Sequence, residues 1–490
     1  MKRCRFLSIL CAAALIMAIA VLPGCQSSTG GASASGSSAA AQQETPTLTW
    51  WLIGNGEPSN LQSVLKKVNN YTSQKIHTKL NIKVASWGTW DNKINQIVNS
   101  GEPFDIMFTN STKYRKQVEL GAFADLTDQI KTDAPELYKL VPQNVWKGVQ
   151  VNGKIYAIPR YNGNAITQYW AFDDRYVKKY HLDVSNIKTF EALDKALTKI
   201  KQGEGKTCYP VKLTQSDAFS GFLNDYDDLT LGFQPVGVRA DDKSHKVVYT
   251  LEQPDIMSKL KLLHKWYQKG IINPDAPTQS EPEKGRIFLS AQGFPGAEAS
   301  WQANDGVPKY DIVQISSPLY TDSGIQGSLN AISANSQHKK EALKMLQLVN
   351  TDQKLLDMLC YGEEGKDFQY VNPKVVKRLS NTWGLPSYAI GTFYHLATLH
   401  NAPANEWETI KKLDDQAVSS TSLGFSPDIS QLTTEITNCQ AVWDKYRFEL
   451  MTGASDPEAM VPKIKQELQA AGMNKLISEL QKQIDAQFKK

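Results

Sequence analysis

The sequence predicts an α/β protein built from more than one domain. Segments with the alternation of a β-strand and segments with the periodicity of a helix follow one another along the first part of the chain. This order is typical of a mostly parallel sheet covered by helices on both faces. The 490 residues exceed what one compact core holds, so two or three domains are expected. Toward the C-terminus the pattern becomes mostly helical.

The predicted elements begin with a strand at 47–54. A capping box of Ser59 and Gln62 then opens a helix whose apolar residues recur at i, i+3, i+4 and i+7. Further strands are expected at 80–84, 103–108, 154–159, 165–172, 246–251, 312–315 and 328–333. Further helices are expected at about 90–98, 112–120, 174–180, 190–203, 256–268, 340–349 and 476–488.

Residues 151–174 are predicted to join the two halves of the chain. Two short β-favouring runs flank an Asn-Gly-Asn turn, and Pro159 fits an edge or a bend because it cannot donate to a ladder. Successive side chains of a strand point to opposite faces, so only one of Tyr169 and Trp170 can face a ligand. The sequence leaves open which of the two it is, and it leaves the role of Arg160 open as well.

The N-terminus has the layout of a bacterial lipoprotein leader. Three basic residues precede an apolar run that ends in LPGC, which resembles a lipobox with Cys25 as the lipidated residue and mature N-terminus. Residues 1–24 are therefore predicted to be a signal peptide, and 25–45 a flexible Ser/Ala/Gly tether. We expect a palmitate-bearing lipid anchor that holds the protein on the extracellular face of the membrane of a Gram-positive cell.

Composition bounds the partners and cofactors. Of the 54 Lys and Arg residues three lie in the leader, which leaves about 51 against 50 Asp and Glu, and this balance gives no reason to expect nucleic acid binding. Cys208, Cys360 and Cys439 are well separated and lack metal-ligand spacing, so they are expected to be buried thiols. No metal and no cofactor are predicted.

Several motifs, in this order behind the lipobox, resemble the extracellular solute-binding lipoproteins of bacterial ABC importers, in the sugar-binding branch with a C-terminal extension. They are FDIMFT at 104–109, NGKIYAIP at 152–159, GSLNAISANSQHKKEALKMLQLVNTD at 327–352, YGEEGKDFQYVN at 361–372, GFSPDISQLTTEITNCQAVWDKYRFELMTG at 424–453 and AAGMNKLISELQKQID at 470–485.

The resemblance implies two α/β lobes joined by three crossings, with a mostly helical C-terminal extension on the second lobe. The N-terminal lobe would comprise 46–158 plus 325–360, and the C-terminal lobe 161–322 plus 362–490. The crossings would lie within 151–174, 315–329 and 361–373. Glycine and proline clusters in these segments fit hinges, which must absorb changes in backbone dihedral angles.

A sugar offers hydroxyl edges and flat C–H faces, so its site needs planar aromatic rings beside short polar side chains. The candidates taken from the first lobe are Trp51, Asn55, Glu57, Trp87 and Asn110. The first crossing contributes Tyr161, Asn162 and Gln168. The second lobe contributes Glu298, Trp301, Trp383 and Tyr388, with Asp225 and Asp227 as secondary candidates.

We therefore expect a monomeric receptor that captures an oligosaccharide outside the cell and delivers it to the permease of an ABC importer. A receptor for peptide or another polar nutrient is the first alternative. A secreted glycoside-active enzyme is the second. The sequence has no HExxH, G-x-S-x-G or P-loop motif, and its acidic pairs lie in turn-like contexts rather than in the arrangement of a glycosidase, so no enzymatic activity is expected.

Overall fold

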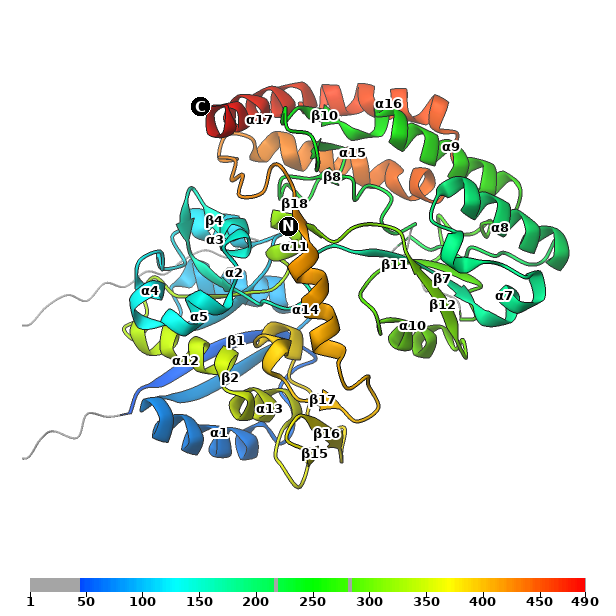
Figure 1. Ribbon diagram of the computed structural model, residues 1–490. Coiled ribbons are helices and arrows are strands. Elements are labelled where there is room, and N and C mark those ends of the chain that lie inside the picture. Colours follow the sequence, from blue (N-terminus) through cyan, green and yellow to red (C-terminus); the bar gives the residue numbers. More distant parts are fainter. Residues whose placement is uncertain (1–44, 216–218, 281–283, 490) are drawn as a thin grey trace, which may run out of the picture. The chain divides into compact units, whose positions relative to one another are not determined.

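The computed structural model describes residues 45–215, 219–280 and 284–489 (Figure 1). The predicted signal peptide, Cys25 and all but the last residue of the predicted tether lie outside the described residues. Within the described part of the chain, no helix combines the length and the apolar character that a membrane span requires.

A five-stranded sheet with the strand order β2-β1-β3-β14-β6 forms the centre of the first half of the chain. Its strands are β1 (Thr47–Gly54), β2 (Lys79–Ser86), β3 (Ile106–Thr109), β6 (Ala157–Pro159) and β14 (Leu329–Ile332). The strand β1 runs parallel to β2 and β3, whereas β14 runs antiparallel to β3 and β6. The register places the ends of β1, β2, β3 and β6 and the start of β14 at one edge, here called the upper strand edge.

Helices and short strands cover this sheet. They are α1 (Leu61–Ile76), α2 (Trp90–Ser100), α3 (Tyr114–Glu119), α4 (Gln129–Asp133), α5 (Pro135–Leu140), α6 (Gln143–Gly148), β4 (Gln150–Val151), β5 (Lys154–Ile155), α12 (Lys339–Thr351) and α13 (Gln353–Tyr361). The predicted stripe of α1, Leu61, Val64, Leu65 and Val68, is buried, which confirms the helical periodicity. These elements share one hydrophobic cluster with the sheet.

The second half of the chain is built on two three-stranded antiparallel sheets. One has the order β11-β7-β12 and the other β10-β9-β8. Their strands are β7 (Gln168–Asp173), β8 (Tyr226–Asp227), β9 (Val236–Arg239), β10 (Val247–Tyr249), β11 (Phe288–Gln292) and β12 (Tyr310–Gln314). The helices are α7 (Asp174–Tyr180), α8 (Phe190–Glu204), α9 (Pro254–Gln268) and α10 (Glu298–Asp305), with 3₁₀ turns at Val184–Asn186 and Thr250–Glu252.

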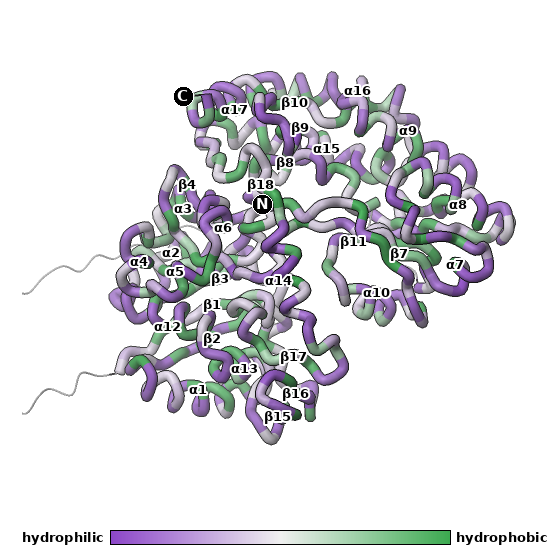
Figure 2. Tube along the Cα trace, viewed as in Figure 1, coloured by the Kyte–Doolittle hydropathy of each residue, from purple (hydrophilic) through white to green (hydrophobic). Residues whose placement is uncertain are grey.

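The C-terminal helices pack on this second half. The helices α15 (Thr433–Met451), α16 (Pro457–Ala470) and α17 (Met473–Phe488) lie beside α9 and β10 in Figure 1 and share their hydrophobic cluster. In Figure 2 the turns of α9 and α16 alternate between hydrophilic and hydrophobic residues, as expected for helices with one buried face. The final helix buries Leu476, Leu480 and Ile484, as its spacing predicted.

The two main hydrophobic clusters define two lobes. We call 46–161 plus 325–400 the first lobe and 168–314 plus 425–489 the second lobe. The first two crossings lie within the predicted segments, at 162–167 between β6 and β7, and at 315–324 between β12 and β14. The second crossing contains β13 (Leu319–Tyr320) and α11 (Asp322–Ile325).

The prediction for the third crossing is wrong, and of the segment 362–490 that was assigned to the second lobe, 362–400 packs on the first lobe whereas 425–489 packs on the second. The sheet of β15 (Phe368–Asn372), β16 (Val375–Arg378) and β17 (Thr398–Leu399) packs its buried side chains into the cluster of the first lobe, as do the 3₁₀ turns Ser387–Ala389 and Phe393–His395 that follow β16. The chain crosses later, through α14 (Glu406–Gln416) and β18 (Val418–Ser419), which pairs with β13. The glycine at 362, taken as a hinge, ends α13 with a φ of 97°.

The three crossings meet at Asp414 in α14. One of its oxygens accepts from Ala165 N at 3.0 Å, and the other accepts from Asn164 N at 3.3 Å and from the Tyr394 hydroxyl at 2.7 Å. The backbone oxygen of Asp414 accepts from the Tyr320 hydroxyl at 3.1 Å. Burial raises the pKa of the Asp414 carboxyl. This residue therefore ties segments of all three crossings together.

Candidate functional site

An exposed aromatic ring stands at the upper strand edge of the first lobe. Trp87 follows β2, is 57% exposed and stacks on Tyr388, with ring centroids 5.8 Å apart and an interplanar angle of 19°. Tyr388 is held in turn by an edge-on contact with Phe108 at 6.3 Å and by a hydrogen bond from its hydroxyl to Ile53 O at 3.4 Å. The Trp87–Tyr388 pair thus presents a positioned apolar ring to solvent at the end of the strands.

Two of the candidates assigned to the second lobe lie in the first. Tyr388 is one, and its lobe was mispredicted because 362–400 folds back onto the first lobe. Trp383 is the other, and the structure places it in the core rather than at a surface: it is 2% exposed and its Nε1 donates to Leu359 O at 3.0 Å. Trp383 is therefore a packing residue.

The remaining first-lobe candidates differ in their environment. Asn55 and Glu57 are exposed in the loop after β1 at the upper strand edge. Asn110 follows β3, and its Oδ1 accepts from the backbone N and the hydroxyl of Thr112, so part of its capacity holds the local turn. Trp51 lies inside β1, half-buried, with Lys93 Nζ 5.1 Å from its ring centroid, so it faces α2 rather than the loops.

The pleat of β7 separates its side chains into two groups. Tyr169 lies beside Trp301 of α10, with ring centroids 6.3 Å apart. Trp170 points the other way, into the core of the second lobe, where it contacts Phe190 edge-on at 5.3 Å. The pleat therefore answers the question that the sequence left open: Tyr169, and not Trp170, accompanies the half-buried indole of Trp301.

Gln168 and Glu298 are engaged by their own lobe. Gln168 is 2% exposed, and its Nε2 donates to Ser220 O at 3.1 Å and to Ser290 Oγ at 3.0 Å. Glu298 Oε2 accepts from Gly296 N at 2.8 Å at the start of α10. Burial, with a smaller contribution from the charge of Glu298, raises the pKa of Tyr169 to about 12, so this hydroxyl stays protonated at neutral pH.

Three residues of different character lie where the first lobe passes into the first crossing. Tyr161 is 2% exposed and contacts Tyr394 edge-on at 5.0 Å. Asn162 is 3% exposed, and neither the Nδ2 nor the Oδ1 of its side-chain amide has a hydrogen-bond partner among the described residues. Arg160 is half-buried with its guanidinium 4.9 Å from the Phe393 ring centroid, and burial lowers its pKa to about 10. Sequence reasoning had left Arg160 open, although it is the one cation within 155–172.

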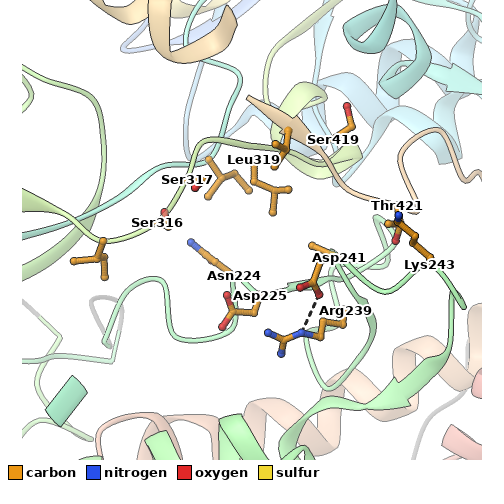
Figure 3. A pocket seen from close by; sticks show the side chains of 14 residues that line it. Asn224, Asp225, Arg239, Asp241, Lys243, Ser316, Ser317, Leu319, Ser419 and Thr421 are labelled. Carbon is orange, nitrogen blue, oxygen red and sulfur yellow. Dashed lines mark hydrogen bonds and ion pairs between the residues drawn. The ribbon is translucent and has the colours of Figure 1, made fainter. Parts of the chain in front are cut away.

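A hollow of about 600 Å³ lies on the face of the crossings opposite Tyr169 (Figure 3). It is lined by Ile166 and Ser316 from the crossings and by Asn224 from the second lobe. Ile166 and Gln168 share one face of the extended chain, and Asn224 Nδ2 donates to Gln168 Oε1, so the hollow opens on the side opposite Tyr169. None of the described residues that line it is aromatic, which fits a sugar face poorly.

The two secondary candidates, Asp225 and Asp227, lie in the part of the second lobe that borders the hollow. Asp225 is exposed at the wall of the hollow and pairs with Lys259 Nζ at 2.7 Å. Asp227 is 2% exposed, and it accepts from Leu229 N at 3.0 Å and from Ser422 Oγ at 2.9 Å. Burial raises the pKa of Asp227. Asp227 is therefore a structural carboxyl rather than a surface group.

Comparisons with known proteins give a consistent result. The family model for bacterial extracellular solute-binding proteins matches residues 55–354, and a domain of unknown function (DUF3502) matches 421–490. A carbohydrate ABC transporter substrate-binding protein from Streptococcus pneumoniae is 28% identical over 486 residues, covering 97% of both chains.

Solved structures agree with this match. The N-glycan transport solute-binding protein NgtS from S. pneumoniae is 27% identical, with a TM-score of 0.78, covering 91% of this chain and 99% of that chain. NgtS in complex with Man5GlcNAc is 29% identical, with a TM-score of 0.69 and the same coverage. An extracellular solute-binding protein from Bifidobacterium longum subsp. infantis, at 16% identity and a TM-score of 0.61, shares the fold over 90% of this chain and 98% of that chain.

Proposed function

The chain belongs to the bacterial extracellular solute-binding proteins, and from this premise we propose that it is the receptor of an ABC importer that captures an oligosaccharide between its two lobes. The observation that carries the proposal is the Trp87–Tyr388 pair, an exposed and positioned ring of the kind that stacks on the flat face of a sugar. The similarity to NgtS, whose structures include complexes with Man1GlcNAc and Man5GlcNAc, supports the ligand class.

In the proposed mechanism the first lobe binds the sugar and the second lobe closes on it. Trp87 stacks on a ring face, while Asn55, Glu57 and Asn110 offer hydrogen bonds to hydroxyl groups at the same strand edge. Trp301, beside Tyr169, adds a second aromatic surface. Closure is favoured because these second-lobe contacts exist only in the closed state, so the ligand shifts the equilibrium by its differential affinity. The cycle makes and breaks no covalent bond.

The cellular setting completes the proposal. Lipidation of Cys25 and the Ser/Ala/Gly tether would hold a monomeric receptor at the extracellular face of the membrane of a Gram-positive cell. The closed, loaded receptor would then dock on the permease subunits of the importer. The lipobox motif and the family match support this arrangement.

Calorimetric titration of the mature chain tests the function. We expect saturable binding to at least one member of a panel of oligosaccharides that includes Man5GlcNAc, with release of heat and no product after prolonged incubation. Silence across the sugars together with a response to peptides would transfer the protein to the peptide-binding alternative. Formation of cleaved sugar at stoichiometric protein would instead support the enzyme alternative.

A further inference from the structure

We propose that the sugar bound by this protein carries a carboxylate, as in a hexuronic or sialic acid residue, and that Arg160 is the residue that recognises it. The inference rests on the proposed function and deepens it, because it names the chemical class of the ligand at the same strand edge.

Arg160 lies at the same strand edge as the Trp87–Tyr388 pair. The residue directly follows β6 at the upper strand edge, and its backbone N donates to Ser328 O at 3.0 Å. The hydroxyl of the same Ser328 donates to Tyr388 O at 2.7 Å. One serine thus connects the backbone of the arginine to the backbone of the stacked tyrosine, which holds the two backbone segments in a fixed relation.

The guanidinium of Arg160 is short of partners. Among the described residues no carboxylate lies within 4.0 Å of it, its Nε has no hydrogen-bond partner, and its one hydrogen bond is a long one of 3.5 Å from Nη2 to Asn162 O. A guanidinium has five donors in a planar fork, and a cation withdrawn from water with unused donors is unfavourable unless another group completes it. The Phe393 ring under the guanidinium holds it in position but accepts none of its N–H groups in a conventional hydrogen bond.

In the described part of the chain, the elements around Arg160 do not supply the missing anion at contact distance. The carboxylate whose charge acts on Arg160 is that of Asp414 in α14, and its oxygens are engaged by Asn164 N, Ala165 N and the Tyr394 hydroxyl. The other titratable groups that face Arg160 are the hydroxyls of Tyr388 and Tyr394 and the thiol of Cys360 in α13, and burial raises the pKa of each, so all three are neutral at pH 7.

A second unpartnered polar group lies two residues away. Asn162 is more than nine-tenths buried, and both its Nδ2 and its Oδ1 lack partners in the described part of the chain. The two coplanar oxygens of a sugar carboxylate can accept hydrogen bonds from the guanidinium fork of Arg160. A neighbouring hydroxyl group of the same sugar ring can pair with the side-chain amide of Asn162. A neutral sugar would leave the cation desolvated and unpaired when the lobes close.

The test compares matched ligands by calorimetry. One pair is an oligosaccharide of hexuronic acid and its carboxyl-reduced neutral counterpart of the same length and linkage; the other is a sialylated glycan and its desialylated form. Wild-type protein should bind the acidic member of at least one pair at least tenfold more tightly. The pair that shows the preference identifies which source of the carboxylate the site accepts.

Substitution then assigns the preference to the residue. We expect Arg160→Gln to bring the two members within about twofold of each other, and Arg160→Lys to retain part of the preference. The exposed Arg378 offers a matched control, because Arg378→Gln changes the net charge equally and should leave the preference intact.

The outcomes separate this inference from the proposed function. Equal or tighter binding of the neutral members by wild-type protein overturns the inference while the receptor proposal stands, and this comparison needs no variant to fold. An unchanged acid preference in Arg160→Gln overturns the role of the arginine. Failure of every oligosaccharide, acidic or neutral, to bind overturns both proposals.

Discussion

Arg115 and Arg160 both belong to the first lobe, the first buried and the second half-buried, but they differ in how their guanidinium groups are satisfied. Arg115 of α3 is 6% exposed and donates three hydrogen bonds of 2.7–3.0 Å, to Ser426 Oγ, Pro427 O and Thr230 Oγ1. Arg160 makes one long side-chain hydrogen bond to the described residues. The guanidinium donors of Arg115 are bonded within the protein, whereas Arg160 has donors that no described residue accepts.

The comparison separates a structural cation from a ligand-binding one. All three acceptors of Arg115 belong to the second lobe, and two of them lie at the start of the region that matches the domain of unknown function. Asn152 N also donates to Ser426 Oγ at 3.4 Å, and Lys147 Nζ lies 5.5 Å from the Phe488 ring centroid. The C-terminal extension therefore contacts the first lobe as well as packing on the second.

The largest effect on stability should come from removing the hydrogen bonds of Arg115. Arg115→Ala deletes three charge-assisted hydrogen bonds and leaves their acceptors poorly solvated, so we expect the free energy of unfolding to fall by about 3 kcal/mol. Arg160→Ala should lower it by less than about 1 kcal/mol, because little is lost. Denaturant unfolding of the two variants beside wild type measures both values. Equal losses would remove the distinction between the two arginines.

The next largest effect concerns ligand affinity and depends on Trp87. Trp87→Ala should weaken oligosaccharide binding by ten- to a hundredfold, about 1.4–2.8 kcal/mol, and leave the melting temperature nearly unchanged because the ring is exposed. Leu120→Ala is a matched control, since Leu120 is also 57% exposed but lies at the end of α3. Loss of affinity in both variants, or in neither, would argue against the upper strand edge as the site.

The stability of the protein should depend on pH through the carboxyl group of Asp322, near Arg115. Asp322 is 2% exposed, both its oxygens accept from Gly424 N, and burial, followed by the charge of Asp227, raises its pKa well above the usual range. A carboxyl whose pKa is raised on folding stabilises the protein fully below the unfolded pKa of about 3.9, and the contribution is lost as pH rises through the folded pKa.

Asp322→Asn should accordingly flatten the decline in stability as the pH rises above about 4, and raise the free energy of unfolding at pH 8 by about 1–2 kcal/mol. Thermal unfolding at several pH values checks this. A variant with the same slope as wild type would show that Asp322 is not the titrating group, and Asp227→Asn would then be the variant to measure.

The smallest effect should come from the second lobe. Trp301 is half-buried against Tyr169, so Trp301→Ala removes less accessible ring than Trp87→Ala does. We expect a three- to fivefold loss of affinity, about 0.7–1 kcal/mol, carried by faster dissociation because closure of the second lobe is weakened. Stopped-flow kinetics measures it. A loss larger than that of Trp87→Ala would make the second lobe the principal binding surface.

The sequence predicted what depends on local patterns. Strand alternation and helical periodicity placed the elements of the first sheet, because these periods follow from backbone geometry alone. The Asn-Gly-Asn turn after Pro159 marked the first crossing for the same reason. Trp87 and Tyr388 were also named as candidates, although they are about 300 residues apart, because tryptophan and tyrosine are the side chains that a sugar face requires.

The tertiary structure decided what depends on which surfaces meet. Residues 362–400 return to the first lobe, which buries Trp383 and brings Tyr388 under Trp87, and no local pattern distinguishes this from packing on the second lobe. The pleat of β7 is set by its pairing with β11 and β12, and this pairing turns Tyr169 toward Trp301 and Gln168 inward. By itself the sequence determined the elements and the kind of residues a sugar site needs. Only the packing of distant segments decided that Arg160 stands half-buried with no carboxylate paired to it among the described residues, because the absence of a partner depends on every element around it.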